Sequence, residues 1–128
     1  MNTTWMRWLF MVAGVYDAGL AVAFLSFGPR IFGAFGVTPP NHWGYLQFPA
    51  LLLVVFAVMF FRIAADPIRR RELMLYGAGL KAAYCLTTFG HELSGGIPGM
   101  WMPWAWLDLL FLASFLLAWS RTGRAAPA

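Results

Sequence analysis

Four long apolar runs constrain this chain more than any other feature of its sequence. They cover residues 8–27, 45–64, 73–89 and 104–119, and a helix needs about 20 apolar residues to cross the hydrocarbon core of a bilayer. Of the 128 residues, 61% are hydrophobic and only 11% are charged. A chain this short could not bury so much apolar surface in one aqueous core. The sequence therefore predicts a single domain over residues 1–128, an all-α integral membrane bundle of four transmembrane helices.

Proline and glycine residues separate the four runs. Gly28-Pro29 is expected to stop the first helix, because proline cannot donate a helical hydrogen bond. Asp66-Pro67 is expected to end the second helix, with Asp66 as the N-cap of a short helix that follows. A Gly-Gly-Ile-Pro-Gly segment at residues 95–99 breaks the chain before the fourth run.

The arginines are distributed unequally between the two sides that four crossings would create. One side, formed by the N-terminus, the second loop and the C-terminus, carries Arg7, Arg62, Arg69, Arg70, Arg71, Arg121 and Arg124. The other side carries only Arg30. Because cytoplasmic loops are enriched in Lys and Arg, the sequence predicts a multi-pass protein of the bacterial inner membrane with both termini in the cytoplasm. A nucleic-acid-binding protein would instead spread its basic residues over one folded face.

Three charged residues lie in the apolar runs away from their cytoplasmic ends. At a helix rise of about 1.5 Å per residue, Asp17, Lys81 and Asp108 lie roughly 13, 12 and 16 Å from the cytoplasmic ends of their helices. Such residues are rare, since each costs about 2.5–3.5 kcal/mol to insert. We therefore expect one cluster near the midplane, in which one carboxylate tends to hold a proton. The sequence leaves open whether this cluster is a functional site or a structural ion pair.

A polar stripe in the third run extends the candidate site. Tyr84, Thr88 and His91 share a helical face with Lys81 and lead from the midplane to the outer surface. This stripe either lines a ligand pocket or a wet path, or it forms hydrogen bonds to neighbouring helices. Gln47 is expected to cap the pocket or to reach the interface. Tyr16 points in a different direction from Asp17 on the first helix, so it need not share the cluster. The candidate ligand or proton site thus comprises Asp17, Gln47, Lys81, Tyr84, Thr88, His91 and Asp108.

No motif in the sequence indicates catalysis or metal binding. Nucleotide, hydrolase and zinc-protease signatures are missing, and the single Cys85 excludes redox chemistry by a cysteine pair within one chain. His42, His91 and Glu92 show no ligand spacing, so no metal site is predicted. An enzyme that uses Tyr84, His91 and Glu92 is the least favoured interpretation, because no nucleophile–base arrangement is visible. The sequence identifies no catalytic residue and no cofactor.

Several short features resemble a known group of proteins. Tyr16-Asp17, Asp66-Pro67, the Gly77-to-Lys81 spacing and Asp108 resemble small bacterial four-helix membrane proteins similar to the DoxX-like group. This resemblance covers most of the chain and implies an accessory role beside respiratory or thiol-oxidising membrane complexes. It carries over no catalytic residue.

The favoured function is therefore that of an accessory or ligand-binding bundle that holds a lipid or quinone around Lys81. The alternative is a small oligomeric proton-coupled transporter or channel that uses the same charged cluster. The expected partners are the bilayer, a lipid or quinone, and further copies of the chain or a larger membrane complex. No nucleic-acid partner is expected.

Overall fold

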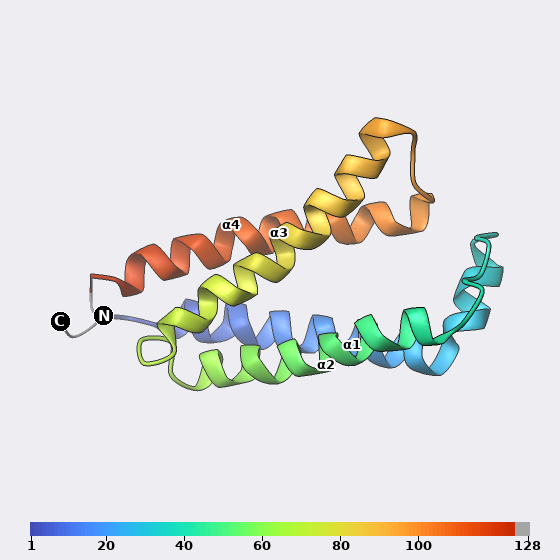
Figure 1. Cartoon of the computed structure of the whole chain (residues 1–128). Helices are drawn as coiled ribbons and strands as arrows, with labels where there is room; N and C mark the ends of the chain where they lie inside the picture. Colours follow the sequence, from blue (N-terminus) through green and yellow to red (C-terminus); the bar gives the residue numbers. More distant parts are fainter. Residues whose placement is uncertain (125–128) are drawn as a thin grey trace.

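The computed structural model describes residues 1–124, which form four long helices and no strand. A single 3-10 turn, η1, covers Gly99–Trp101. The long helices are α1 (Thr4–Ala34), α2 (Gly44–Ala65), α3 (Arg71–Ser94) and α4 (Met102–Thr122) (Figure 1). The all-α, four-helix prediction is confirmed for this part of the chain.

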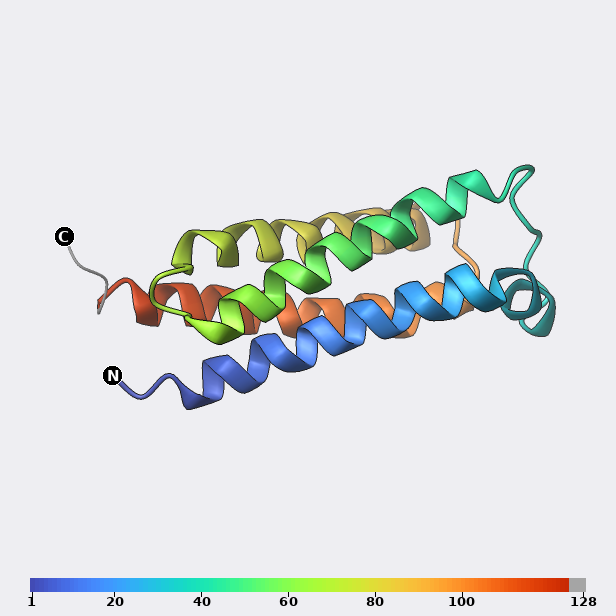
Figure 2. The ribbon, with the colours of Figure 1, turned by 90° about the horizontal axis from the view of Figure 1, so that it is seen from below.

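The four helices are organised as two antiparallel hairpins. α1 packs along α2 and α3 packs along α4, whereas contacts between the two hairpins are sparse. Figures 1 and 2 show α3 crossing α2 obliquely, so that the hairpins are close at one end and diverge toward the other. α1 begins and α4 ends at the end where the hairpins are close.

An apolar core joins the hairpins at their close end. Phe10 of α1 stacks on Phe115 of α4 with ring centroids 4.6 Å apart, and Phe60 of α2 lies 5.2 Å from Phe115. Met74 of α3 completes this fully buried cluster. The close approach of α3 to α2 depends on Gly77, because a Cβ atom there would lie 2.6 Å from Cε1 of Phe60.

Each hairpin is closed at this end by an arginine. The Arg7 guanidinium, in the first turn of α1, donates to the carbonyl of Ala65 at 2.6 Å. Nε of Arg71, the first residue of α3, donates to the carbonyl of Trp119 at 3.0 Å. In both hairpins a cation at the start of the first helix thus donates to a carbonyl near the end of the second, where the helix dipole is negative.

The same spacing separates these arginines from the charged residues further along. Asp17 follows Arg7 by ten residues, and Lys81 follows Arg71 by ten residues. The two hairpins therefore place a capping arginine and a buried charge at equivalent positions.

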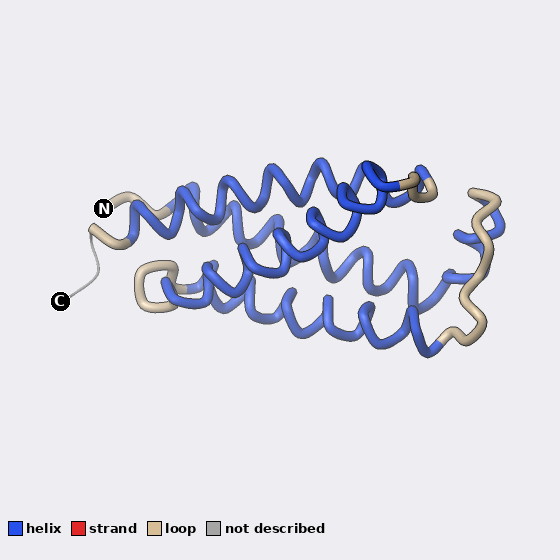
Figure 3. Tube along the Cα trace, turned by 45° about the horizontal axis from the view of Figure 1, so that its top comes forward, coloured by secondary structure: helices blue, strands red, loops and turns tan. Residues whose placement is uncertain are grey.

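The prediction that Gly28-Pro29 stops the first helix is wrong. α1 continues to Ala34 and bends at Phe27, whose φ and ψ are −129° and 19°. The bend accommodates Pro29, which has no N–H to donate to the preceding turn and whose ring crowds that turn. The helix therefore changes direction instead of ending, as Figure 3 shows. The short helix expected after Asp66 is a single turn, in which Oδ1 of Asp66 accepts a hydrogen bond from the Arg69 amide at 3.2 Å.

Three stretches are long and apolar enough to cross a membrane: Thr4–Ala34, Gly44–Ala65 and Gly99–Thr122. Only 28%, 28% and 22% of the residues in their most apolar windows are buried, so most apolar side chains face outward. Such extensive apolar surface indicates a membrane protein. α3 has 24 residues but carries Glu72, Lys81 and Glu92, which lower its hydropathy. A crossing by α3, and with it the count of four, stays a prediction.

Candidate functional site

The structure brings Asp17, Lys81 and Asp108 together, as the sequence predicted. Nζ of Lys81 donates to Oδ1 of Asp17 at 2.8 Å and to Oδ1 of Asp108 at 3.0 Å. The three residues are 1%, 1% and 7% exposed, respectively. One residue from each of α1, α3 and α4 thus forms a buried ion-paired cluster, called here the charged cluster.

Small residues one helical turn away make room for the charged cluster. Asp17 lies between Ala13 and Ala21 on α1, both fully buried. Lys81 follows the buried Gly77 by one turn, and Asp108 follows the buried Ala105 by three residues. Residues three or four apart share a helical face, so these positions let the helices approach closely enough to enclose the charges.

Aromatic rings surround the ammonium group. Nζ of Lys81 lies 4.9 Å from the ring centroid of Tyr16 and 5.0 Å from that of Phe111, distances at which a cation is attracted to an aromatic face. Two carboxylates against one amine leave one surplus negative charge when all three groups are ionised. Because a lone charge is costly in a medium of low polarity, a bound proton or a cationic partner is needed to balance it.

Two polar atoms beside the charged cluster lack a partner. Oδ2 of Asp17 and the hydroxyl of Tyr16 are buried and make no hydrogen bond within residues 1–124. Buried polar atoms are nearly always hydrogen-bonded in folded proteins. Both residues line the same cavity, so the two unpartnered atoms lie beside it.

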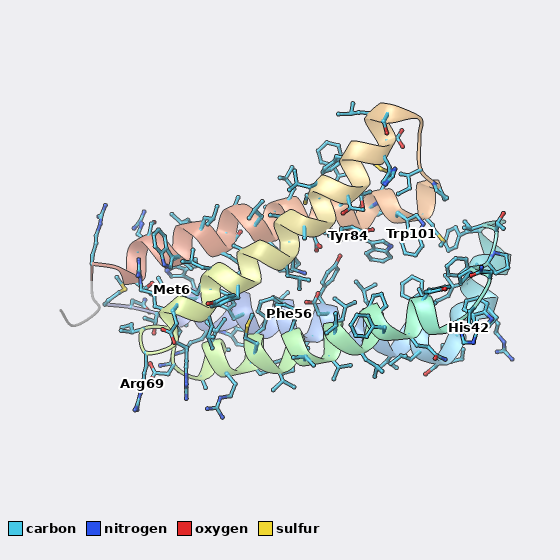
Figure 4. All side chains as sticks on the ribbon, viewed as in Figure 1. Met6, His42, Phe56, Arg69, Tyr84 and Trp101 are labelled. Carbon is cyan, nitrogen blue, oxygen red and sulfur yellow. The ribbon has the colours of Figure 1, made fainter. Side chains whose placement is uncertain are left out.

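The cavity has a volume of about 510 Å³, within the range of about 300–1,000 Å³ that is typical of small-molecule sites. It lies between the two hairpins, and Figure 4 shows Phe56, Tyr84 and Trp101 pointing into the space between them. Side chains from all four helices and from η1 line it. Its lining consists of Tyr16, Asp17, Leu20, Phe24, Leu46, Pro49, Ala50, Leu52, Leu53, Phe56, Leu80, Ala83, Tyr84, Thr87, Trp101, Trp104 and Asp108.

The cavity opens sideways, between α2 and α3. Leu52 of α2 and both Ala83 and Thr87 of α3 line the cavity and are exposed. Away from the charged cluster, Phe24 stacks on Trp101 with centroids 5.6 Å apart and closes the far end. A sideways opening between apolar helices is suited to entry from the lipid phase.

Of the remaining predicted site residues, only Tyr84 lines the cavity, where its hydroxyl donates to the Trp101 carbonyl at 2.8 Å. Thr88 is buried but does not line the cavity, and the neighbouring Thr87 does. His91 and Gln47 are exposed and lie outside the lining. The last turns of α3 diverge from the other hairpin (Figure 1), which separates His91 from the cavity.

The sequence left open whether Tyr16 joins the charged cluster, and in the structure it does. Its ring packs against Phe111 and Trp104, at centroid distances of 5.2 and 6.1 Å, and covers the Lys81 ammonium. A tyrosine next to Asp17 diverges from it by about 100° on the helix, but the long side chain reaches back. Sequence reasoning also missed Trp104, although it lies four residues before Asp108 and therefore on the same face of α4.

Within residues 1–124, no three His, Cys, Asp or Glu side chains converge to hold a metal ion. The chain matches no protein-family model, no curated protein and no solved structure. The resemblance to the DoxX-like group therefore stays a prediction. The geometry of the charged cluster and its cavity is the basis for a functional assignment.

Proposed function

We propose that this chain is a four-span protein of the bacterial inner membrane that binds a membrane-dissolved small molecule between its two hairpins. Lipids and quinones are the ligand classes that the sequence suggests. The observation that carries the proposal is the apolar cavity of about 510 Å³, whose lining includes Asp17 and Tyr16, each with a buried polar atom that has no partner. An apolar cavity with a few convergent polar groups is the usual form of a ligand site.

The orientation in the membrane is part of the proposal. Arg7 and Arg71 cap helices at the end of the bundle where α1 begins, and Arg69, Arg70 and Arg121 belong to the same end. The excess of arginine supports a cytoplasmic location for this end. The charged cluster then lies near mid-depth, and the cavity occupies the outer half of the bilayer.

Binding would place the polar part of the ligand against Asp17 and Tyr16. The apolar part would lie along the leucines of α2, and a longer chain would leave between Leu52 and Thr87 into the lipid. Such a ligand needs no passage through water, because the cavity opens between membrane-facing helices.

Native mass spectrometry of gently purified protein tests this proposal. We expect a bound small molecule that is lost in Ala83→Trp, since the indole fills the mouth of the cavity. Leu86→Trp is the matched control: Leu86 lies three residues later on α3 and is 76% exposed, so it adds the same ring outside the cavity. An absence of any bound molecule in several detergents, or equal retention by Ala83→Trp, would contradict the proposal.

The second candidate is an oligomeric proton-coupled transporter or channel, favoured by the surplus carboxylate in the charged cluster. It predicts proton or solute flux in proteoliposomes that Asp17→Asn or Lys81→Met abolishes while the protein stays folded. An accessory subunit of a larger membrane complex would instead co-purify with that complex and show no flux on its own.

A further inference from the structure

We infer that the cavity selects a lipophilic organic cation, which binds in exchange for a proton of the charged cluster. This inference rests on the proposed function, because it names the ligand class of the same cavity. It is carried by the juxtaposition of an unpartnered buried carboxylate oxygen, a surplus acidic group and a wall of aromatic rings.

The charge balance of the site favours a cation. The Lys81 ammonium is bonded to Oδ1 of both Asp17 and Asp108, which leaves one carboxylate charge unmatched. A cation beside Oδ2 of Asp17 brings the site to neutrality, whereas an anionic headgroup would leave two unmatched charges in a low-polarity medium. In the exchange one cation enters and one proton leaves to water, so the net charge of the site is unchanged.

The walls of the cavity have the composition of a cation site. Six of the lining residues are aromatic: Tyr16, Phe24, Phe56, Tyr84, Trp101 and Trp104. Aromatic faces attract organic cations, and desolvated ones most strongly. No lysine or arginine of residues 1–124 lines the cavity. The nearby Lys81 ammonium lies behind the wall and is already paired with both carboxylates.

The exchangeable proton resides on Asp17 or Asp108. α1 also presents Tyr16 to this region, α3 presents Lys81, Tyr84 and Cys85, and α4 presents Asp108 alone. The groups that α2 contributes to the cavity are all apolar. Tyr84 and Cys85 donate to the carbonyls of Trp101 and Ala105 at 2.8 and 3.4 Å. Both are therefore committed elsewhere and do not neutralise the surplus carboxylate.

Tetraphenylphosphonium and tetraphenylborate provide the test, because they have nearly the same size and opposite charge. Their binding to detergent-solubilised protein is measured by equilibrium dialysis, and binding to the cavity is defined as the part that Ala83→Trp removes. This definition subtracts the fraction of each ion that dissolves in the detergent micelle. We expect the phosphonium ion to bind at least about tenfold more tightly than the borate.

The exchange also predicts proton release. A pH indicator in weakly buffered solution should report about one proton released per phosphonium ion bound. By linkage, the apparent affinity should rise by up to about tenfold per pH unit while the departing proton is still bound in the free protein. A neutral ligand would show neither effect.

Substitution of Asp17 locates the site. Asp17→Asn removes the surplus charge, so phosphonium affinity should fall at least about tenfold and proton release should disappear. Asp66→Asn makes the same chemical change in the exposed second loop and should bind as the unsubstituted protein does. If Asp17→Asn does not fold, Asp108→Asn makes the same change of charge in the same cluster.

The outcomes separate the inference from the proposed function. Borate binding equal to or tighter than phosphonium binding, or phosphonium binding without proton release, overturns the inference. If neither ion enters the cavity but a neutral lipid or quinone co-purifies in an Ala83-dependent manner, the inference fails and the proposed function stands. If no molecule of any kind occupies the cavity, both fail.

Discussion

Replacing Lys81 by methionine measures what the charged cluster contributes to stability. Methionine keeps most of the apolar stem but removes both hydrogen bonds, at 2.8 and 3.0 Å, and leaves two carboxylates that are at most 7% exposed. Hydrogen bonds to charged groups contribute about 1.5–3 kcal/mol each, and breaking a buried ion pair costs about 3–5 kcal/mol. We therefore expect Lys81→Met to lower the free energy of unfolding by about 3–5 kcal/mol at neutral pH.

The measurement is an unfolding titration with sodium dodecyl sulfate in mixed micelles, followed by tryptophan fluorescence. Arg62→Met is the matched control, since Arg62 is exposed at the end of α2 and surface changes usually alter stability by less than about 0.5 kcal/mol. The folded variant must take up protons to neutralise its two carboxyl groups, which are ionised when unfolded at neutral pH. Its stability deficit should therefore shrink as the pH is lowered toward 5.

A triple variant distinguishes the cost of orphaned charges from the net value of the cluster. Asp17→Leu, Lys81→Met and Asp108→Leu together remove every charge, and such replacements are often neutral or stabilising. We expect the triple variant to recover most of the stability lost by Lys81→Met. If Lys81→Met is as stable as Arg62→Met, the ion pairs contribute nothing and the reasoning is refuted.

Three further predictions concern packing, capping and topology. Gly77→Ala should be less stable than Gly79→Ala by about 1–3 kcal/mol in the same titration. A Cβ at residue 77 meets the buried Phe60 ring, whereas one at residue 79 meets nothing within 4 Å. Equal stabilities of the two variants would contradict the tight α2–α3 contact. Arg71→Ala should lower the free energy of unfolding by about 1.5–3 kcal/mol, because it removes the hydrogen bond to the Trp119 carbonyl near the end of α4. Arg69→Ala is the control, and a loss of stability no larger than that of Arg69→Ala would count against the cap. A cysteine at residue 96, in a Cys85→Ser background, should react with an impermeant maleimide added outside intact cells, and reaction only after lysis would reverse the proposed orientation.

The meeting of the three charged residues could be predicted from the sequence, whereas their surroundings could not. A helix has a fixed rise per residue, so the positions of Asp17, Lys81 and Asp108 along their helices place them at one level of the bundle. The rotation of each helix and the choice of its partner depend on side-chain packing, which single-helix periodicity does not contain. The division into two hairpins, and the cavity that their divergence creates, were therefore found only in the structure.

The errors at the candidate site have equally local causes. Gly28-Pro29 bends α1 instead of ending it, because the helix tolerates the missing N–H of Pro29 by a non-helical conformation at Phe27 and then continues. His91 shares a helical face with Lys81, and Gln47 is a polar residue of the second apolar run, but both lie outside the cavity lining. A polar residue at the right spacing joins a site only where the neighbouring helix stays close, and α3 diverges from the other hairpin before it reaches His91.

The equal spacing of Arg7 to Asp17 and of Arg71 to Lys81 has a consequence for how the two hairpins select each other. A hairpin paired with a second copy of itself would place like charges at equivalent positions. Opposite charges at Asp17 and Lys81 instead favour pairing of the α1–α2 hairpin with the α3–α4 hairpin and disfavour pairing of either hairpin with its own copy.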